Sequence, residues 1–346
     1  MISYTYMHLK LSDTSIELLK QLPNFSAPLP YLQRLLVPSI VYSLASILPL
    51  HNIQLFFLLD LLFVSLLFFT MNSLLCEEFS ITQARCLSWL FILLLPLMSV
   101  INYMFTVGGK GPYYYPYDTS SLFFLAAGYL LCLRAKWFAL YALILIATFN
   151  RESSILLVLL IPALHWHHLR SVLKPLAWAS LIFFCARFII WLILHGHSGH
   201  WVELYFGGEQ VTCFRGNILW LFHYHNLFLV LFCFAGLPLF WFGLYDAIPI
   251  KYRPVRYVAL LYFLALLFIG HIREARILGE IVVLLYFPVC VAFNLWLTSD
   301  LPVESERKGL VYYINRYAVL AVLFLVFIFH QPLETLVLFF ARHNWL

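Results

Sequence analysis

Residues 53–75 read IQLFFLLDLLFVSLLFFTMNSLL, an apolar run with one charged side chain, Asp60. About 20 mainly apolar residues in a helix cross the hydrocarbon core of a bilayer, so this stretch predicts a membrane-spanning helix. The rest of the chain repeats the pattern, since 63% of its 346 residues are hydrophobic and 11% are charged. Mean hydropathy is +0.90. Soluble globular chains are about 25% charged, so the composition predicts an integral membrane protein with no soluble catalytic domain.

Similar apolar runs follow one another along the chain. They lie at about 35–50, 53–75, 87–104, 118–133, 137–149, 153–168, 173–195, 218–245, 254–270, 277–298 and 317–330. The first contains Pro38 and Pro49, and we expect it either to lie in the membrane interface or to re-enter without crossing. We predict an all-α fold, a polytopic transmembrane helical bundle with about 10–11 spans. In this bundle 1–30 form a polar N-terminal segment and 31–346 a single transmembrane domain.

Charge and cysteine usage exclude several classes of partner. The formal net charge is +5, but the basic residues stand in short loops between apolar runs, which is the positive-inside pattern of membrane proteins. We therefore predict no nucleic-acid partner. The opening segment lacks the apolar stretch of a secretory signal. The seven cysteines are scattered without a CxxC pair, which indicates neither a disulfide framework nor a zinc site.

The basic loops predict an orientation in the membrane. If the spans alternate, one side carries Arg134, Lys136, Arg170, Lys174, Lys251, Arg253, Arg256, Arg307 and Lys308. By the positive-inside rule that side is cytoplasmic. The loop 105–117, the junction 150–152, the loop 196–217 and the segment 271–276 then share the outer face. A single site at the outer face requires these segments to lie on the same side of the membrane.

The first candidate for chemistry is the end of a glycine-rich loop at 108–112, where tyrosines lead into Asp118. One interpretation makes Asp118 a helix N-cap, a position at which asparagine serves as well as aspartate. The other places a carboxylate at the mouth of a cavity, with Tyr115 and Tyr117 stacking on a sugar. The glycines match neither a P-loop nor a dinucleotide fingerprint.

Two further charged clusters fall on the predicted outer side. In Asn150-Arg151-Glu152, a guanidinium offers a planar fork of donors that suits phosphate, whereas the structural alternative is an internal pair between Arg151 and Glu152. Between 271 and 280, helical spacing would place Arg273, Arg276 and Glu280 on one face, beside Glu274. The alternative there is a self-neutralised salt-bridge cluster.

Other polar residues give weaker signals. Asp60 and Arg187 lie within apolar spans, where a charge is either functional or part of a structural pair. His195 and His197 have the spacing of a metal-binding pair, but no carboxylate stands at HExxH spacing. The sequence therefore predicts no metal site and no cofactor, with a divalent cation as an open alternative.

Three segments resemble the polytopic glycosyltransferases of the GT-C class, which include protein O-mannosyltransferases and lipid A aminoarabinose transferases. Residues 117–124, YDTSSLFF, resemble the acidic residue that opens a phenylalanine-rich helix in those enzymes. Residues 147–152, ATFNRE, resemble their short-helix junction, where a basic residue meets the donor phosphate. Residues 30–38, PYLQRLLVP, resemble the stretch after their first outer loop. Uncharacterised bacterial membrane proteins with a late Arg-Glu-x-Arg segment are also similar.

In one respect the chain departs from that class, whose catalytic aspartate follows a first transmembrane helix. No apolar span precedes residue 31 here, and Asp13 and Glu17 are the acids left in the corresponding region. The resemblance implies a GT-C-like bundle in a bacterial inner membrane, surrounded by lipid, with a polyprenyl-phosphate-linked sugar as donor. Asp118 or Asp13 would then be catalytic.

The resemblance also implies roles for the other candidates. Arg151, Glu152, Arg273, Glu274, Arg276, Tyr115 and Tyr117 would bind substrate. The acceptor would be a lipid, a glycan or a protein. Two alternatives stay open, namely a transporter or flippase of lipid-linked glycans or small molecules, and a non-catalytic GT-C-like subunit. The sequence does not tell whether the chain has protein partners.

Overall fold

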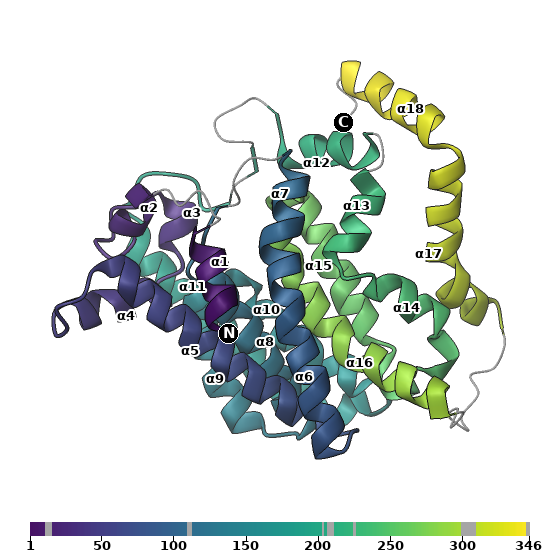
Figure 1. Ribbon diagram of the computed structural model, residues 1–346, viewed down its shortest axis with the longest axis horizontal. Coiled ribbons are helices and arrows are strands. Elements are labelled where there is room, and N and C mark those ends of the chain that lie inside the picture. Colours follow the sequence, from purple (N-terminus) through teal and green to yellow (C-terminus); the bar gives the residue numbers. More distant parts are fainter. Residues whose placement is uncertain are drawn as a thin grey trace. The chain divides into compact units, whose positions relative to one another are not determined.

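The computed structural model describes residues 1–10, 16–108, 113–202, 204–205, 211–223, 226–298 and 309–343. Within these ranges the chain forms helices and no strand, apart from an isolated β-bridge between Tyr205 and Thr212. The chain divides into two compact units, Met1–Val202 and Glu203–Leu346 (Figure 1). Each unit is described by itself.

The first unit holds the elements α1 to α11. They are α1 (Ile2–Lys10), α2 (Ile16–Gln21), α3 (Leu29–Leu32), α4 (Leu36–Ala45), α5 (Asn52–Leu75), α6 (Ile81–Pro96), the π-helical η1 (Leu97–Ile101), α7 (Asn102–Thr106), α8 (Asp118–Leu133), α9 (Trp137–Asn150), η2 (Glu152–Ser154), α10 (Ile155–Leu164), η3 (Trp166–His168) and α11 (Leu169–Leu194). Its centre is α8, which packs against α5, α9 and α10.

The second unit contains the remaining elements. They are α12 (Cys213–Phe222), α13 (Asn226–Cys233), α14 (Leu237–Gly243), η4 (Tyr245–Ala247), η5 (Ile250–Tyr252), α15 (Val255–Ile269), η6 (Ala275–Leu278), α16 (Gly279–Thr298), α17 (Leu310–Ile328) and α18 (His330–Arg342). In this unit α16 is the most buried helix, whereas α17 is almost fully exposed.

Six helices of the described chain have the length and composition of membrane spans. They are Asn52–Leu75, Ile81–Thr106, Trp166–Leu194, Ile250–Ile269, Ala275–Thr298 and Leu310–Ile328. The helices α12 and α13, bent by 102° to each other, make a seventh candidate. Four shorter apolar helices, α4, α8, α9 and Glu152–Leu164, account for the other predicted spans. The prediction of an all-helical, multi-pass membrane protein is confirmed, and the count of 10–11 crossings stays a prediction.

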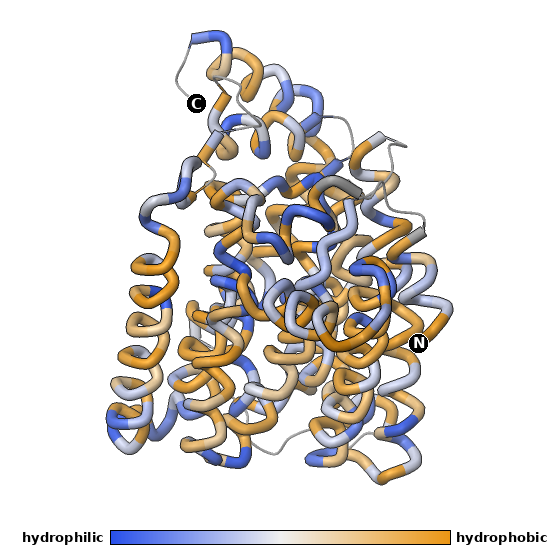
Figure 2. The backbone as a smooth tube through the Cα atoms, turned by 90° about the vertical axis from the view of Figure 1, so that its left-hand side faces the viewer, coloured by the Kyte–Doolittle hydropathy of each residue, from blue (hydrophilic) through white to orange (hydrophobic). Residues whose placement is uncertain are grey.

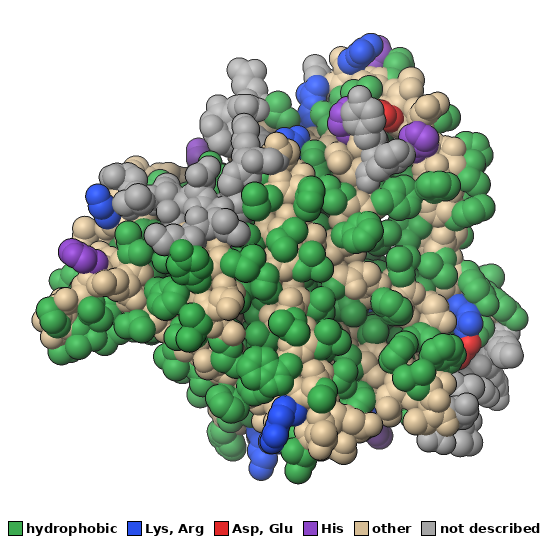
Figure 3. All heavy atoms as spheres, in the orientation of Figure 1, with side chains coloured by type: hydrophobic (Ala, Val, Ile, Leu, Met, Phe, Trp, Pro, Cys, Tyr) green, Lys and Arg blue, Asp and Glu red, His purple; other side chains and the backbone are tan. Residues whose placement is uncertain are grey.

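The surface agrees with a lipid environment. Apolar residues fill the helices and polar residues gather at helix ends (Figure 2). Hydrophobic side chains cover most of the face shown in Figure 3, and on α11 the rings of Phe184, Phe188 and Trp191 are all exposed. Exposed apolar groups on this scale would be unstable in water but are well solvated by lipid tails.

Close packing in the first unit fixes the two helices that carry the candidate site. A Cβ atom added to Gly128 of α8 would overlap the side chain of Leu157, so α8 and α10 approach each other closely because this residue has no side chain. A short turn at Arg134–Lys136 joins α8 to α9, which makes them antiparallel neighbours. The start of α8 therefore lies beside the end of α9.

Candidate functional site

Asn150 fixes the start of α8 to the end of α9. Its Nδ2 donates to the Tyr117 carbonyl at 3.3 Å and to Ser121 Oγ at 3.0 Å, while its Oδ1 accepts from Ser120 Oγ at 2.7 Å. The helix ends at this residue, because Arg151 is extended with φ −162° and ψ 146°. The structure thus has two short helices where the sequence shows the apolar runs 137–149 and 153–168, namely α9 and the continuous η2–α10 pair.

The extended backbone of Arg151 brings its side chain to Asp118. Arg151 Nη1 donates to Asp118 Oδ1 at 3.3 Å, and both side chains are less than a tenth exposed. Asp118 is the first residue of α8, with Tyr117 at the N-cap position, so the interpretation of Asp118 as an N-cap is wrong. Its carboxylate instead neutralises a buried guanidinium.

A second ion pair stands next to the first. Arg34 Nη2 donates to Glu152 Oε1 at 2.9 Å, and the Arg34 guanidinium lies 4.4 Å from the centre of the Tyr117 ring. The Glu152 side chain is 41% exposed, which limits the desolvation that would raise its pKa, and the charge and hydrogen bond of Arg34, with the charge of Arg151, lower that pKa to about 2. The carboxylate is therefore ionised at neutral pH. The sequence allowed an internal pair between Arg151 and Glu152. In the structure each of them pairs with a residue of another element, Arg151 with Asp118 and Glu152 with Arg34.

A third arginine, Arg187 of α11, meets no carboxylate in a described contact. Its Nη2 donates to Gln33 Oε1 at 2.6 Å, and the Gln33 amide is oriented because its Nε2 donates to the Trp201 carbonyl at 2.8 Å. The other terminal nitrogen, Arg187 Nη1, is enclosed and has no hydrogen-bond partner among the described residues. A buried donor without an acceptor is costly, so a ligand oxygen is the natural partner.

Apolar packing explains why Arg187 faces α3. Ile190 and Leu194 of α11 pack against Leu29, Leu32 and Leu35. Since Arg187 precedes Ile190 by three residues, its side chain lies on the same side of α11 as Ile190. Gln33 and Arg34 follow α3 directly. This packing therefore brings Gln33 to Arg187 and Arg34 to Glu152, close enough for the charge of Glu152 to act on Arg187.

The tyrosines of the site stack mainly on one another. The rings of Tyr31 and Tyr115 lie 5.6 Å apart and nearly parallel, and Tyr115 lies 5.6 Å from Tyr117. Tyr115 and Tyr117 are buried, so in this structure their described contacts are with protein groups. Sugar stacking on either ring stays a prediction.

The predicted residues Arg273, Glu274 and Arg276 lie in the second unit. Asn217 Nδ2 donates to the carbonyls of Leu267 and Gly270 at 3.0 and 2.6 Å, and its Oδ1 accepts from the Ile272 amide at 3.1 Å. This clamp holds the break between α15 and η6.

The expected helical face of Arg273, Arg276 and Glu280 is therefore wrong. Arg273 lies in a turn, since the hydrogen bonds of Asn217 stop the helix before it. Arg276 pairs with Glu274, and Glu280 accepts from the Tyr262 hydroxyl. The segment behaves as the self-neutralised cluster that the sequence offered as its alternative.

Some predicted features lie outside the described residues. Asp13, residues 109–112 and the basic pair at 307–308 fall there. Among the described residues no three His, Cys, Asp or Glu side chains cluster as metal ligands. The contributions of Arg34 and Gln33 were missed, although both stand in the quoted 30–38 segment.

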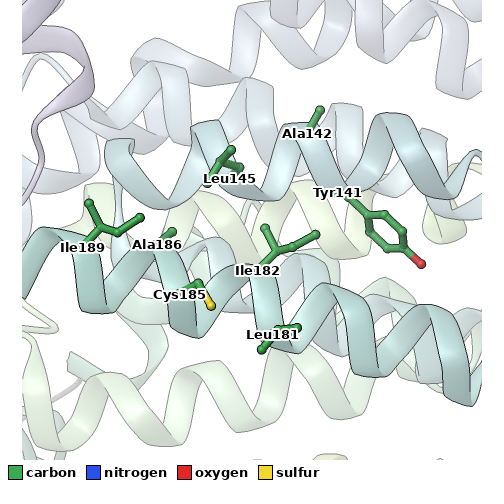
Figure 4. Close-up of a pocket in the computed structure, with 8 residues that line it drawn as sticks. All are labelled: Tyr141, Ala142, Leu145, Leu181, Ile182, Cys185, Ala186 and Ile189. Atoms are coloured by element: carbon green, nitrogen blue, oxygen red, sulfur yellow. The ribbon is translucent and has the colours of Figure 1, made fainter.

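A groove between α9 and α11 lies apart from these polar contacts (Figure 4). It is lined by Tyr141, Ala142, Leu145, Leu181, Ile182, Cys185, Ala186 and Ile189. Several of these side chains are exposed and no charged group faces the groove. Its character suits the acyl chain of a lipid rather than a reacting group.

A scan against protein-family models, a search of curated proteins and a search of solved structures each gave no match.

Proposed function

We propose that this protein is a membrane glycosyltransferase that moves a sugar from a polyprenyl-phosphate donor to a lipid, glycan or protein acceptor. The reaction takes place at the outer face of a bacterial inner membrane. The observation that carries the proposal is the charge balance of the site. Arg34 and Arg151 each have a carboxylate partner. Among the described residues Arg187 donates to the Gln33 amide, interacts with Glu152 through charge, and keeps one donor, Nη1, without a hydrogen-bond partner.

The surplus positive charge suits a phosphate. A guanidinium presents its donors in a plane that matches two phosphate oxygens, and such charge-assisted hydrogen bonds are the strong ones. Arg187 lies seven residues before the end of α11 at Leu194, which is about 10 Å along the helix axis. At that depth a lipid phosphate reaches Arg187 while its hydrocarbon chain stays among the apolar helices.

The paired groups supply the remaining chemistry. A donor phosphate that accepts a hydrogen bond from Arg151 competes with the Asp118 carboxylate for the Arg151 guanidinium. Asp118, or Asp13, then takes the proton of the acceptor hydroxyl as general base. The acceptor oxygen bonds to the sugar carbon, the bond from that carbon to the phosphate oxygen breaks, and the arginines stabilise the charge on the departing polyprenyl phosphate. Donors of this kind are already activated, so no nucleotide is required.

Equilibrium binding of polyprenyl phosphate to the purified protein tests the proposal. We expect Arg187→Gln to weaken binding by about ten- to a hundredfold, the effect of losing a charge-assisted contact worth roughly 1.5–3 kcal/mol. Arg134→Gln is the matched control, since Arg134 pairs with Glu77 at the opposite end of α8. Equal losses in the two variants would contradict the assignment.

One observation favours a different function, transport of lipid-linked glycans or small molecules. The bent α12–α13 pair resembles the discontinuous helices that form substrate sites in transporters. Turnover separates the alternatives. A glycosyltransferase releases polyprenyl phosphate from a radiolabelled polyprenyl-phosphate sugar when an acceptor is present. A transporter moves the intact donor across a vesicle membrane, and a non-catalytic subunit does neither.

A further inference from the structure

A second buried polar cluster lies in the first unit, away from the three arginines. The helix α1 packs against α5, α6 and η1. Its residues Tyr4, Thr5 and His8 share one side by helical spacing and are at most 3% exposed. His8 lies 3.8 Å from Asp60, which is 1% exposed although it belongs to the apolar helix α5. A short amphiphilic helix thus packs a polar residue beside a buried carboxylate of an apolar helix.

Several oxygens of this cluster have no hydrogen-bond partner among the described residues. They are Asp60 Oδ1 and Oδ2, Thr5 Oγ1 and Tyr114 Oη, all fully enclosed. Buried polar atoms in folded proteins almost always have a partner. Burying an ionised carboxylate costs several kcal/mol unless a cation or hydrogen-bond donors compensate it. The arrangement therefore calls for a ligand that binds oxygen.

The spacing of the groups indicates what that ligand is. His8 Nδ1 lies 3.8 Å from Asp60 Oδ1. This distance is beyond the hydrogen-bond range, whose upper end is about 3.2 Å. It is an ion-pair distance when His8 is protonated. Two ligand atoms on one tetrahedral ion, with bonds of about 2.0–2.2 Å, lie roughly 3.3–3.6 Å apart, so a small approach of the two side chains would let both bind one metal.

Tyr114 belongs to the same cluster. Its ring meets the His8 ring edge-on with 4.7 Å between centroids. The Tyr114 hydroxyl is enclosed, as are both carboxylate oxygens of Asp60. A cation between them would compensate Asp60 and accept the phenol oxygen as a ligand.

We propose that His8, Asp60 and Tyr114 bind a divalent transition-metal ion, Mn²⁺ or Zn²⁺. An imidazole nitrogen together with carboxylate and hydroxyl oxygens is a donor set for these ions, whereas Mg²⁺ and Ca²⁺ prefer oxygen alone. The third protein ligand is a hydroxyl, since no third His, Cys, Asp or Glu joins this pair among the described residues. The site does not depend on the proposed glycosyl transfer.

Hydrogen bonds connect the proposed metal site to the candidate site. Tyr4 Oη and Thr119 Oγ1 are 3.3 Å apart, and Ser99 Oγ of the π-helical turn donates to Tyr4 Oη at 3.4 Å. Thr119 directly follows Asp118. Through these contacts a bound ion fixes α1 against the start of α8 and so helps to position Asp118.

Metal binding to the full-length protein in lipid nanodiscs tests the proposal. After treatment with a chelator, Mn²⁺ is added and the free ion is measured by electron paramagnetic resonance, with Zn²⁺ as competitor. We expect one enclosed Mn²⁺ per chain. Its affinity should fall by at least about tenfold in Asp60→Asn and in His8→Ala, since even outer-shell changes cost about 10–100-fold. Glu77→Gln, an exposed carboxylate on the same unit, is the control.

Each other outcome has a defined meaning. No binding of Mn²⁺ or Zn²⁺ by the parent overturns the proposal. Binding that persists unchanged in Asp60→Asn and His8→Ala overturns it too, because the ion then sits on surface histidines. If Asp60→Asn fails to fold, as judged by gel filtration, His8→Ala and Tyr114→Phe decide the question. Tyr114→Phe keeps the ring packing and removes one ligand oxygen.

Discussion

The Asp118–Arg151 pair gives the sharpest test of the site geometry. Asp118→Asn keeps the shape of the side chain and removes its charge, which leaves a guanidinium that is 7% exposed without its closest counter-ion. Removing one partner of a buried pair costs about 3–5 kcal/mol. The nearby charge of Glu152 offsets part of this loss, so we expect about 3 kcal/mol. A helix cap would behave differently, because asparagine replaces aspartate there at little cost.

A double-mutant cycle measures the interaction directly. Arg151→Met should be similarly destabilising, and the double variant should be less destabilised than the sum of the two by about 2–3 kcal/mol. The assay is equilibrium unfolding in mixed detergent micelles. The exposed pair Arg134–Glu77 serves as the control cycle, with coupling of at most about 1 kcal/mol. The buried pair would be refuted if each single substitution lowered the free energy of unfolding by less than about 1 kcal/mol and the two losses simply added in the double variant.

Three further predictions concern packing, pH and orientation. Gly128→Ala should destabilise the protein by about 1–3 kcal/mol through overlap with Leu157, whereas Gly243→Ala, with open space around it, should not; thermal unfolding of both variants decides. Glu152→Gln should lower stability at pH 7 by up to about 1 kcal/mol. Because Arg34 depresses the pKa of Glu152, that difference should be full above pH 4.5 and vanish as pH falls towards about 2; equal deficits at pH 7 and pH 2 would contradict it. Reporter fusions should place the loop 251–256 in the cytoplasm and the loop 196–217 outside, and fusions reporting one common side would refute the orientation.

The sequence was sufficient to predict the helices and one contact of the site. Apolar runs of spanning length are visible without a structure, because lipid imposes a minimum length on each crossing. The meeting of Asp118 with Arg151 also follows from the sequence, since a short turn between two adjacent apolar runs makes them antiparallel. Both residues then stand at the same end of the pair.

The partners from distant segments were not predictable in the same way. Gln33 and Arg34 reach the site because α3 packs on the end of α11, and no periodicity of either segment specifies that packing. The N-terminal segment reads as polar, so its insertion beside α5 was not expected. The one sign of this insertion in the sequence is that Tyr4 and His8 stand four residues apart, on one side of a helix. By composition alone, that side looks like a face exposed to solvent.

The helical face expected of Arg273 and Glu280 failed for a related reason. Helical spacing is informative only where the helix continues, and here Asn217, more than 50 residues earlier, binds the backbone at the break. A long-range side-chain contact thus overrides the local pattern.

The central claim, that surplus positive charge at Arg187 binds the phosphate of a lipid-linked donor, is tested most directly by a structure with polyprenyl phosphate bound. We expect a phosphate oxygen within about 2.7–3.2 Å of Arg187 Nη1. Arg151 should lie within reach of the same phosphate. A lipid phosphate bound elsewhere, with Arg187 Nη1 still without a phosphate contact, would show that Arg187 is not the phosphate-binding residue.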